Sequence, residues 1–292
     1  MATGTSACKT NWSNTWASDH DGLALAVANL ASQAGKAVMD IYAEGFDVIE
    51  KNDGSPLTRA DLAADEIVAE GLRSLVPSLP LLSEETADNA KPEALGKTFF
   101  VVDPLDGTRE FVGKNGEFSV NIALVDDGAP IVGVVYAPAQ SKMWFAGNIA
   151  YAAKVQPGEP VDPSATHKIR TCPDPEAPIR AVASRSHRDE QTNSFLRKMN
   201  GCKTMSIGSA LKFCLVAEGE ADVYPRFGPT MVWDTAAGIA VLQAAGGLVL
   251  DEDGEPMQVR YGPDGWRNGA FTAWGCEGFK DRTIGTLKKD EI

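Results

Sequence analysis

The chain has 292 residues, of which 43% are hydrophobic and 23% are charged, a composition typical of globular proteins. Its net charge of −13 at pH 7 argues against binding to a nucleic acid polymer, which requires a basic surface. No apolar run reaches the roughly 18 residues that a membrane-spanning helix needs.

The N-terminal sequence, MATGTSACKTNWSNTW, lacks the basic start and apolar stretch of a signal peptide, and its Ala2 argues against N-myristoylation. Five cysteines are scattered with no CxxC spacing, which favours reduced thiols over a disulfide or zinc framework. We therefore expect a cytoplasmic protein with no integral membrane segment, and peripheral association with a membrane stays open. Nothing in the sequence indicates an obligate protein partner.

Hydrophobic spacing in the first half predicts helices and short strands. Apolar residues recur at helical spacing over 21–43, after a polar tail at 1–20. Three apolar runs, at 118–125, 131–137 and 142–147, are joined by short turns and predict an antiparallel meander. Before the meander we expect, in chain order, a strand at 46–51, a turn at 53–56, a helix at 58–75 and strands at 80–85 and 98–102.

Residues 156–178 contain six prolines and are the best candidate for a linker. Beyond them helices alternate with strands: we expect strands at 179–183, 221–224, 247–251 and 270–274, and helices at 189–199, 209–218, 233–245 and the C-terminus. The predicted organisation is therefore a polar tail (1–20), an α+β sub-domain (21–155), a linker (156–178) and an α/β sub-domain (179–292). A cleft between two such sub-domains favours a ligand site.

Carboxylates stand where buried elements begin or end. Glu84 and Glu85 follow a short strand, Asp103 and Asp106 follow the apolar run TFFVV, and Asp234 opens a helix. Each has an ordinary interpretation: Asp234 as an acid favoured at a helix N-terminus, Asp106 as part of an Asp-Gly turn, and the two glutamates as a solvated loop. Taken together, carboxylates at the ends of buried strands are costly unless they are paired or bind a metal.

An all-oxygen set of ligands, in a chain with three histidines, points to Mg²⁺ rather than zinc. The proline between Asp103 and Asp106 stiffens the backbone, so that both side chains and the Leu105 carbonyl can converge on one point. Gly107 and Thr108 then offer backbone N–H groups to a phosphate oxygen. This combination predicts metal-assisted hydrolysis of a phosphate ester.

Thr58 and Asp61 allow two interpretations. The pattern T-x-x-D before an apolar helix resembles a capping box in which Asp replaces Glu or Gln. Alternatively, Asp61 accepts a proton from the Thr108 hydroxyl and helps it to polarise a nucleophilic water. The two roles are compatible, and both stay open at this point.

Several motifs resemble one known family. DPLDGT (103–108), WDTAAG (233–238) and the upstream glutamate pair are similar to signature elements of the inositol-monophosphatase-like, lithium-sensitive Mg²⁺ phosphatases. DPLDGTREF, NGEFSVNIALV, SRSH (184–187) and the segment 206–238 resemble, within that family, the CysQ-type 3′(2′),5′-bisphosphate nucleotidases. The resemblance covers roughly residues 20–275 and implies a layered α-β-α-β-α sandwich, which agrees with the mixed α+β and α/β pattern above.

The resemblance also implies the site. Two or three Mg²⁺ ions would be held by five matching ligands: Glu84, Asp103, the Leu105 carbonyl, Asp106 and Asp234. Thr108 and Asp61 match the pair that orients the attacking water, with Glu84 helping to activate it. Gly107 and Thr108 match the amides that hold the phosphate.

Substrate contacts are implied in the same way by Ser184, His187, Gly208 and Lys212, with Arg226 as a further candidate. A nucleotide with two phosphates needs cations away from the metals, which Lys212 and Arg226 can supply. Lys212 could instead extend along its helix toward solvent, and His187 could only cap the next helix. Arg109-Glu110, in place of small polar residues, favours a nucleotidase over an inositol phosphatase.

The expected reaction is Mg²⁺-dependent removal of the 3′-phosphate from 3′-phosphoadenosine 5′-phosphate, giving AMP and phosphate. The resemblance also implies activity on 3′-phosphoadenosine 5′-phosphosulfate and a link to sulfur assimilation. The nearest alternative is an inositol-phosphate or sugar-phosphate phosphatase with the same metal site. A non-catalytic nucleotide-binding sensor is a remote alternative, because it would be expected to lack a ligand, and all five are present.

Overall fold

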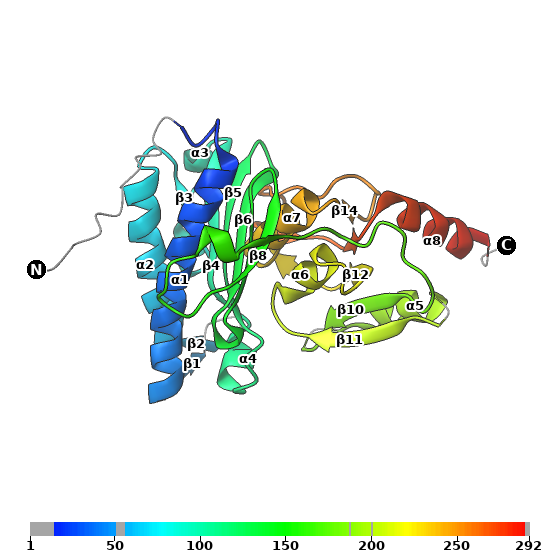
Figure 1. Cartoon of the computed structure of the whole chain (residues 1–292), viewed down its shortest axis with the longest axis horizontal. Coiled ribbons are helices and arrows are strands. Elements are labelled where there is room, and N and C mark those ends of the chain that lie inside the picture. The colour runs from blue at the N-terminus through cyan, green and yellow to red at the C-terminus, as the bar shows by residue number, and fades with distance from the viewer. Residues whose placement is uncertain (1–14, 51–55, 187, 200, 290–292) are drawn as a thin grey trace, which may run out of the picture.

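The computed structural model describes residues 15–50, 56–186, 188–199 and 201–289. These residues form five layers of helices and sheets (Figure 1). At one end lie two long helices, α1 (His20–Glu44) and α2 (Arg59–Leu75), which pack side by side. The α1 helix begins where its N-cap, Asp19, accepts a hydrogen bond from the Gly22 N–H at 2.8 Å.

The second layer is a seven-stranded sheet with the order β3-β4-β5-β6-β7-β8-β9. Its β3–β4 pair is parallel and the other neighbours are antiparallel. The strands are β3 (Leu81–Ser83), β4 (Thr98–Asp106), β5 (Ser119–Asp126), β6 (Ala129–Ala137), β7 (Lys142–Ala146), β8 (Ala150–Lys154) and β9 (His167–Lys168). Short helical segments lie in its connections: η2 (Glu84–Asn89), α3 (Pro92–Leu95), α4 (Thr108–Val112), η3 (Pro138–Gln140) and η4 (Pro163–Ala165).

The central layer consists of α6 (Leu211–Ala217) and α7 (Val232–Ala244), which lie between the two sheets in Figure 1. The α7 helix is apolar around its whole circumference because it contacts both sheets. Gly133 in β6 allows its close approach, since a Cβ there would lie 2.4 Å from the Ala237 carbonyl oxygen. A buried cluster that includes Trp144, Phe213 and Trp233 fills this interface.

The second sheet has five strands in the order β11-β10-β12-β16-β14. They are β10 (Arg180–Ser184), β11 (Lys203–Ile207), β12 (Val223–Arg226), β14 (Leu248–Asp251) and β16 (Phe271–Trp274). Its outer face carries α5 (Glu190–Lys198) and α8 (Glu277–Lys289) (Figure 1). Two small antiparallel pairs complete the fold: β1 (Val48–Glu50) with β2 (Pro56–Thr58), and β13 (Thr230–Met231) with β15 (Arg267–Asn268).

The layered sandwich and the antiparallel meander expected from the sequence are confirmed. The expected turn at 53–56 lies partly outside the described residues, and its last residue, Pro56, begins β2. Six strands of the described chain were not predicted: β2, β8, β9, β11, β13 and β15. The strand over 98–102 continues to Asp106, so the expectation that it ends before Asp103 was wrong.

The sub-domain boundaries stay a prediction. The proline-rich segment 156–178 contains β9, which pairs with β8 and so continues the seven-stranded sheet. Of the predicted polar tail, 1–14 lie outside the described residues. Among the helices of the described chain, none is both long and apolar enough to cross a membrane.

Candidate active site

A cavity of about 410 Å³ opens between the acidic end of β4 and the elements around the start of α7. Both halves of the chain contribute to its walls. The residues that line it and that the sequence predicted are Glu84, Asp103, Leu105, Asp106, Gly107, Thr108, Ser184, Gly208, Lys212, Arg226 and Asp234. The structure therefore brings together eleven of the thirteen predicted site residues; Asp61 lies behind Thr108, and His187 is outside the described residues.

The end of β4 explains how one short segment supplies several cavity residues. Asp103 pairs with Asn121 and Asp106 pairs with Ser119, so the β4 strand contains one extra residue between these pairs. Such a bulge bends the strand and redirects its side chains. The proline that follows Asp103 has no N–H to leave unpaired, and the Leu105 N–H donates to Asp103 Oδ1 at 3.1 Å.

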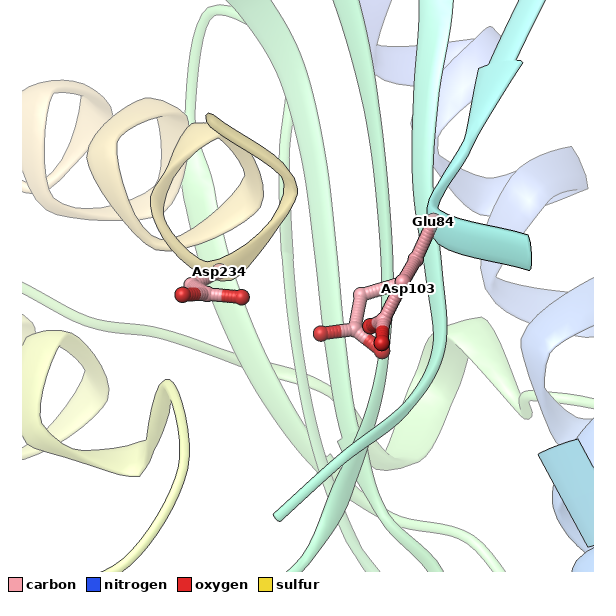
Figure 2. A group of neighbouring side chains, drawn as sticks. All are labelled: Glu84, Asp103 and Asp234. Carbon is pink, nitrogen blue, oxygen red and sulfur yellow. The ribbon is translucent and has the colours of Figure 1, made fainter. Parts of the chain in front are cut away.

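Three carboxylates from separate elements meet in the cavity. Glu84 starts η2, Asp103 lies on β4 and Asp234 lies in the first turn of α7. One oxygen from each lies within 4.8 Å of the others. Figure 2 shows their carboxylates directed at the same space. The Asp234 side chain is fixed by the Met231 N–H, which donates to its Oδ2 at 2.9 Å.

Two of these carboxylates, Asp103 and Asp234, are protonated more readily than free ones. Burial raises the pKa of Asp103 well above its usual range, and the neighbouring Glu84 raises it further. Burial raises the pKa of Asp234 to about 8, with the Asp106 carboxylate as the next cause. These side chains therefore need positive charge to be ionised together. A hard divalent cation with oxygen ligands fits this donor set.

Asp106 is not one of the three carboxylates whose oxygens lie within 4.8 Å of one another, although it lines the same cavity. Its Oδ2 accepts hydrogen bonds from the Ala210 N–H at 2.6 Å and from Asn121 Nδ2 at 3.1 Å. Burial raises its pKa to about 6, although the Lys212 ammonium opposes that shift. Asp106 thus anchors the start of α6 to β4, and its role as a metal ligand stays a prediction.

Asp61 makes both contacts that the sequence left open. Its Oδ2 accepts from the Thr58 N–H at 2.8 Å and from Thr58 Oγ1 at 2.7 Å, and Thr58 Oγ1 accepts from the Ala60 N–H, which completes the capping box. Its Oδ1 lies 3.2 Å from Thr108 Oγ1, which also lies 3.1 Å from the Leu105 carbonyl. Burial raises the pKa of Asp61 despite the Thr58 hydrogen bonds.

Gly107 has a φ of +88°, a left-handed conformation that favours glycine. A Cβ at this position would lie 3.2 Å from the Glu117 carbonyl oxygen and 3.3 Å from Glu110 Oε2. The turn places the Thr108 N–H at the start of the short helix α4. A side chain at position 107 would therefore disturb the backbone of a turn that lines the cavity.

Two buried cations line the same cavity as the acids. Lys212 is 5% exposed and Arg226 is 6% exposed. The Lys212 ammonium donates to the Ile207 and Ser209 carbonyls, so the interpretation in which it extends toward solvent was wrong. Burial lowers its pKa to about 8, and the Asp106 carboxylate opposes that shift. Arg226 donates from Nε to the Gly228 carbonyl and from Nη2 to the Pro229 carbonyl.

The loop before α6 is held by acids from the first half of the chain. Glu117 Oε2 accepts from the Gly208 N–H at 2.8 Å, and the Glu117 carboxylate forms two hydrogen bonds with Arg185. The Glu110 carboxylate accepts from Ser186 Oγ at 2.6 Å. Gly208 packs against both glutamates, because a Cβ there would meet the Glu110 side chain and the Glu117 backbone at 2.7 Å.

Sequence reasoning missed several cavity residues. Tyr224 lies within the segment 206–238 that carries the resemblance but was not singled out, and Arg267 belongs to no recognisable motif. Asn121, which supports Asp106, could have been found: it is the one amide in the otherwise apolar run of β5 and pairs with Asp103. A lone amide on a buried strand needs a polar partner, and that need is a usable signal.

Comparisons with known proteins agree with this architecture. A model of the inositol monophosphatase family matches residues 19–274. Two relatives named 3′(2′),5′-bisphosphate nucleotidase CysQ, from Shigella flexneri and Escherichia coli K12, are each 47% identical over 233 residues, or 79% of this chain and 91% of theirs.

Comparison with solved structures also finds proteins of this fold. CysQ from Bacteroides thetaiotaomicron, described as a bacterial member of the inositol monophosphatase family, is 38% identical with a TM-score of 0.75, over 88% of this chain and 98% of that one. An IMPase from Thermotoga maritima is 22% identical with a TM-score of 0.71, over 92% of this chain and 97% of that one, a likeness that shows the fold alone. The chain belongs to the inositol monophosphatase family.

Proposed function

We propose that this protein removes the 3′-phosphate from 3′-phosphoadenosine 5′-phosphate in a Mg²⁺-dependent reaction that gives AMP and phosphate. One observation carries the proposal: a single cavity contains both an acidic cluster and the buried cations Lys212 and Arg226. A substrate with two phosphates can use both, one phosphate at the metal ions that the acids would hold and the other at the cations. The names of the CysQ relatives, which are 47% identical, support the same assignment.

The metal ligands in this proposal are Glu84, Asp103, the Leu105 carbonyl, Asp106 and Asp234, which would hold two or three Mg²⁺ ions. Bound Mg²⁺ would stabilise charge on the transferred phosphoryl group and lower the pKa of the attacking water. The raised pKa values of Asp103 and Asp234 support this assignment, because carboxylates in one buried space need a cation to be ionised together.

The residues of the chain itself would position the water and hold its protons. With Asp61 Oδ1 as acceptor of the Thr108 hydroxyl hydrogen, the lone pairs of Thr108 Oγ1 are available to accept a hydrogen bond from the water. The second Asp61 oxygen is held by Thr58, so the carboxylate cannot swing away. The Glu84 carboxylate is the acceptor that we assign to the water proton.

The two phosphates of the substrate would be bound by different groups. We assign the reacting phosphate to the backbone N–H groups of Gly107 and Thr108, beside the acidic cluster. Lys212 and Arg226 would bind the nucleotide and its 5′-phosphate, together with Ser184, His187 and Gly208. The 5′-phosphosulfate analogue has a similar anionic group at that end, so the proposal includes it as a second substrate and a link to sulfur assimilation.

The free thiols of Cys172, Cys202, Cys214 and Cys276 support a reducing compartment, so we propose that the protein acts in the cytoplasm. Phosphate release from adenosine 3′,5′-bisphosphate tests the function directly. We expect turnover that needs Mg²⁺, is inhibited by Li⁺ and is abolished by Asp103→Asn. Release that persists in chelator or in the Asp103→Asn variant would contradict the metal site, and no release from the wild type would contradict the assigned substrate.

A further inference from the structure

Arg267 is a cavity residue that no motif indicates. It lies on β15 and pairs in register with Met231 of β13, the strand that precedes α7. Its side chain lines the cavity and is exposed to solvent, unlike the buried Lys212 and Arg226. Arg267 therefore lies at the open rim, on the wall that the second half of the chain supplies.

The guanidinium of Arg267 has no partner: among the residues that the structure describes, it makes no hydrogen bond, ion pair or ring contact. Lys212, by contrast, donates to two backbone carbonyls, and Arg226 donates to the carbonyls of Gly228 and Pro229. The deeper cations therefore use part of their donors on the backbone, and at most the remainder can bind a ligand. The donors of Arg267 are available to a ligand, and a guanidinium can bind two oxygens of one phosphate.

The backbone that carries Arg267 is fixed on both sides. Trp266 is buried at 6% exposure, and its ring packs edge-on against Tyr261 at 5.1 Å between centroids. Asn268 is buried and its Nδ2 lies within hydrogen-bond distance of Thr230 Oγ1, the Met231 carbonyl and Thr235 Oγ1. A short strand with buried neighbours thus directs one cationic side chain outward at the cavity rim.

We propose that Arg267 binds the second anionic group of the substrate and so selects doubly charged nucleotides over monophosphates. The inference rests on the proposed function. Arg109, the other exposed arginine of the cavity wall, directly follows Thr108 and so lies at the end assigned to the reacting phosphate. Arg267 lies on β15, in the second half of the chain, and we assign it to the group at the other end of the nucleotide.

The test compares wild type, Arg267→Met and Arg267→Lys on two substrates. Adenosine 3′,5′-bisphosphate carries the second anion, and adenosine 3′-phosphate lacks it. We expect Arg267→Met to lower kcat/KM for the bisphosphate by about tenfold or more, mainly through KM, because a charge-assisted hydrogen bond to phosphate is lost. We expect Arg267→Lys to recover part of the loss, since lysine keeps the charge but not the two-point geometry.

Adenosine 3′-phosphate, followed as a substrate or as a competitive inhibitor, should respond less than twofold to either change. Arg260→Met is the matched control, because Arg260 is exposed on the same segment but does not line the cavity. An equal loss with both nucleotides, or no loss with the bisphosphate, would overturn the role of Arg267. A wild type that is inactive on the bisphosphate would instead refute the proposed function, so the two failures are distinguishable.

Discussion

Replacing Asp234 with asparagine should stabilise the metal-free protein and abolish its phosphatase activity. Asp234 is a carboxylate at the start of α7 that shares a buried space with Glu84 and Asp103. Without a cation, this side chain must either be protonated or remain charged near other acids. Asparagine has a similar shape and still offers an oxygen to the Met231 N–H, which now donates to Asp234 at 2.9 Å.

The size of the effect follows from the shifted pKa of Asp234, which rises from 3.8 to about 8 because of burial and the Asp106 charge. At pH 7 the unfolded chain has this carboxyl ionised and the folded chain has it mostly protonated, which costs about 4 kcal/mol at roughly 1.4 kcal/mol per pH unit. The new amide NH₂ also needs a partner in the cavity. We therefore expect a net gain of about 2–4 kcal/mol.

The sign of the pH dependence follows from the same shift. Because the folded pKa is raised, the wild type has its full stability below about pH 4 and loses it progressively as the pH rises toward 8. In the Asp234→Asn variant this contribution disappears, so its metal-free stability should depend less on pH. The two proteins should therefore differ little near pH 4 and most near pH 8.

Thermal unfolding in EDTA and in excess Mg²⁺ measures this difference. At pH 7 in EDTA we expect the Tm of Asp234→Asn to lie roughly 4–16 °C above the wild type, given about 2–4 °C per kcal/mol for a chain of this size. Mg²⁺ should raise the Tm of the wild type and have a smaller effect on the variant. Asp253→Asn, in an exposed loop away from the cavity, is the control for loss of one charge.

A variant that is less stable than the wild type in EDTA would refute this reasoning, because it would show that the carboxylate stabilises the fold without a cation. Equal stabilisation of both proteins by Mg²⁺ would show that Asp234 is not a ligand. Either result would leave the layered fold intact and remove the electrostatic argument for the metal site.

Three further perturbations separate the roles of neighbouring residues. Asp61→Ala should lower kcat by at least about tenfold. Thr58→Ala loses the hydroxyl contact to the other Asp61 oxygen but keeps the backbone N–H contact, so it should mainly cost about 0.5–2 kcal/mol of stability. Comparable losses of kcat for the two variants in steady-state assays would contradict the assignment of the Thr108–Asp61 contact. Gly107→Ala should destabilise the protein by about 1–3 kcal/mol in denaturant titrations and reduce activity, because φ is +88° and the new Cβ meets Glu117. Gly254 has a similar φ of +83° but open space around it, so Gly254→Ala should cost only the backbone strain of about 1 kcal/mol. Equal costs for the two variants would argue against the contact with Glu117. Burial lowers the pKa of Lys212 to about 8, so kcat/KM for the bisphosphate should fall as the pH rises above that value. In Lys212→Met, kcat/KM should be lower and should depend less on pH in the alkaline range. If kcat/KM of the variant falls with pH as in the wild type, Lys212 is not the cause of that fall.

Much of the site was predictable because its residues lie in contiguous motifs. The acids at the end of TFFVV and at the start of the 233–245 helix could be interpreted from the cost of an unpaired buried carboxylate. The helices α1 and α2 were predicted almost to the residue because each has an apolar stripe and a polar N-cap. The family resemblance then implied the same residues as metal ligands.

Contacts between distant segments could not be predicted in the same way. Asp106 accepts a hydrogen bond from the Ala210 N–H, which is 104 residues away in the sequence, and Glu117 accepts one from the Gly208 N–H, which is 91 residues away. The bulge between Asp103 and Asp106 depends on the register with β5, which no local signal in β4 specifies. Arg267 was missed for a related reason: its position at the cavity depends on the pairing of β15 with β13.

The ratio of kcat/KM for adenosine 3′,5′-bisphosphate to that for inositol 1-phosphate, measured with saturating Mg²⁺, tests the central claim most directly. The acidic cluster serves either substrate, but the buried cations Lys212 and Arg226 benefit only a substrate with a second anionic group. We predict a ratio of at least about 100, which corresponds to roughly 3 kcal/mol of preferential transition-state binding. A ratio below one would contradict the account and assign the site to inositol phosphates.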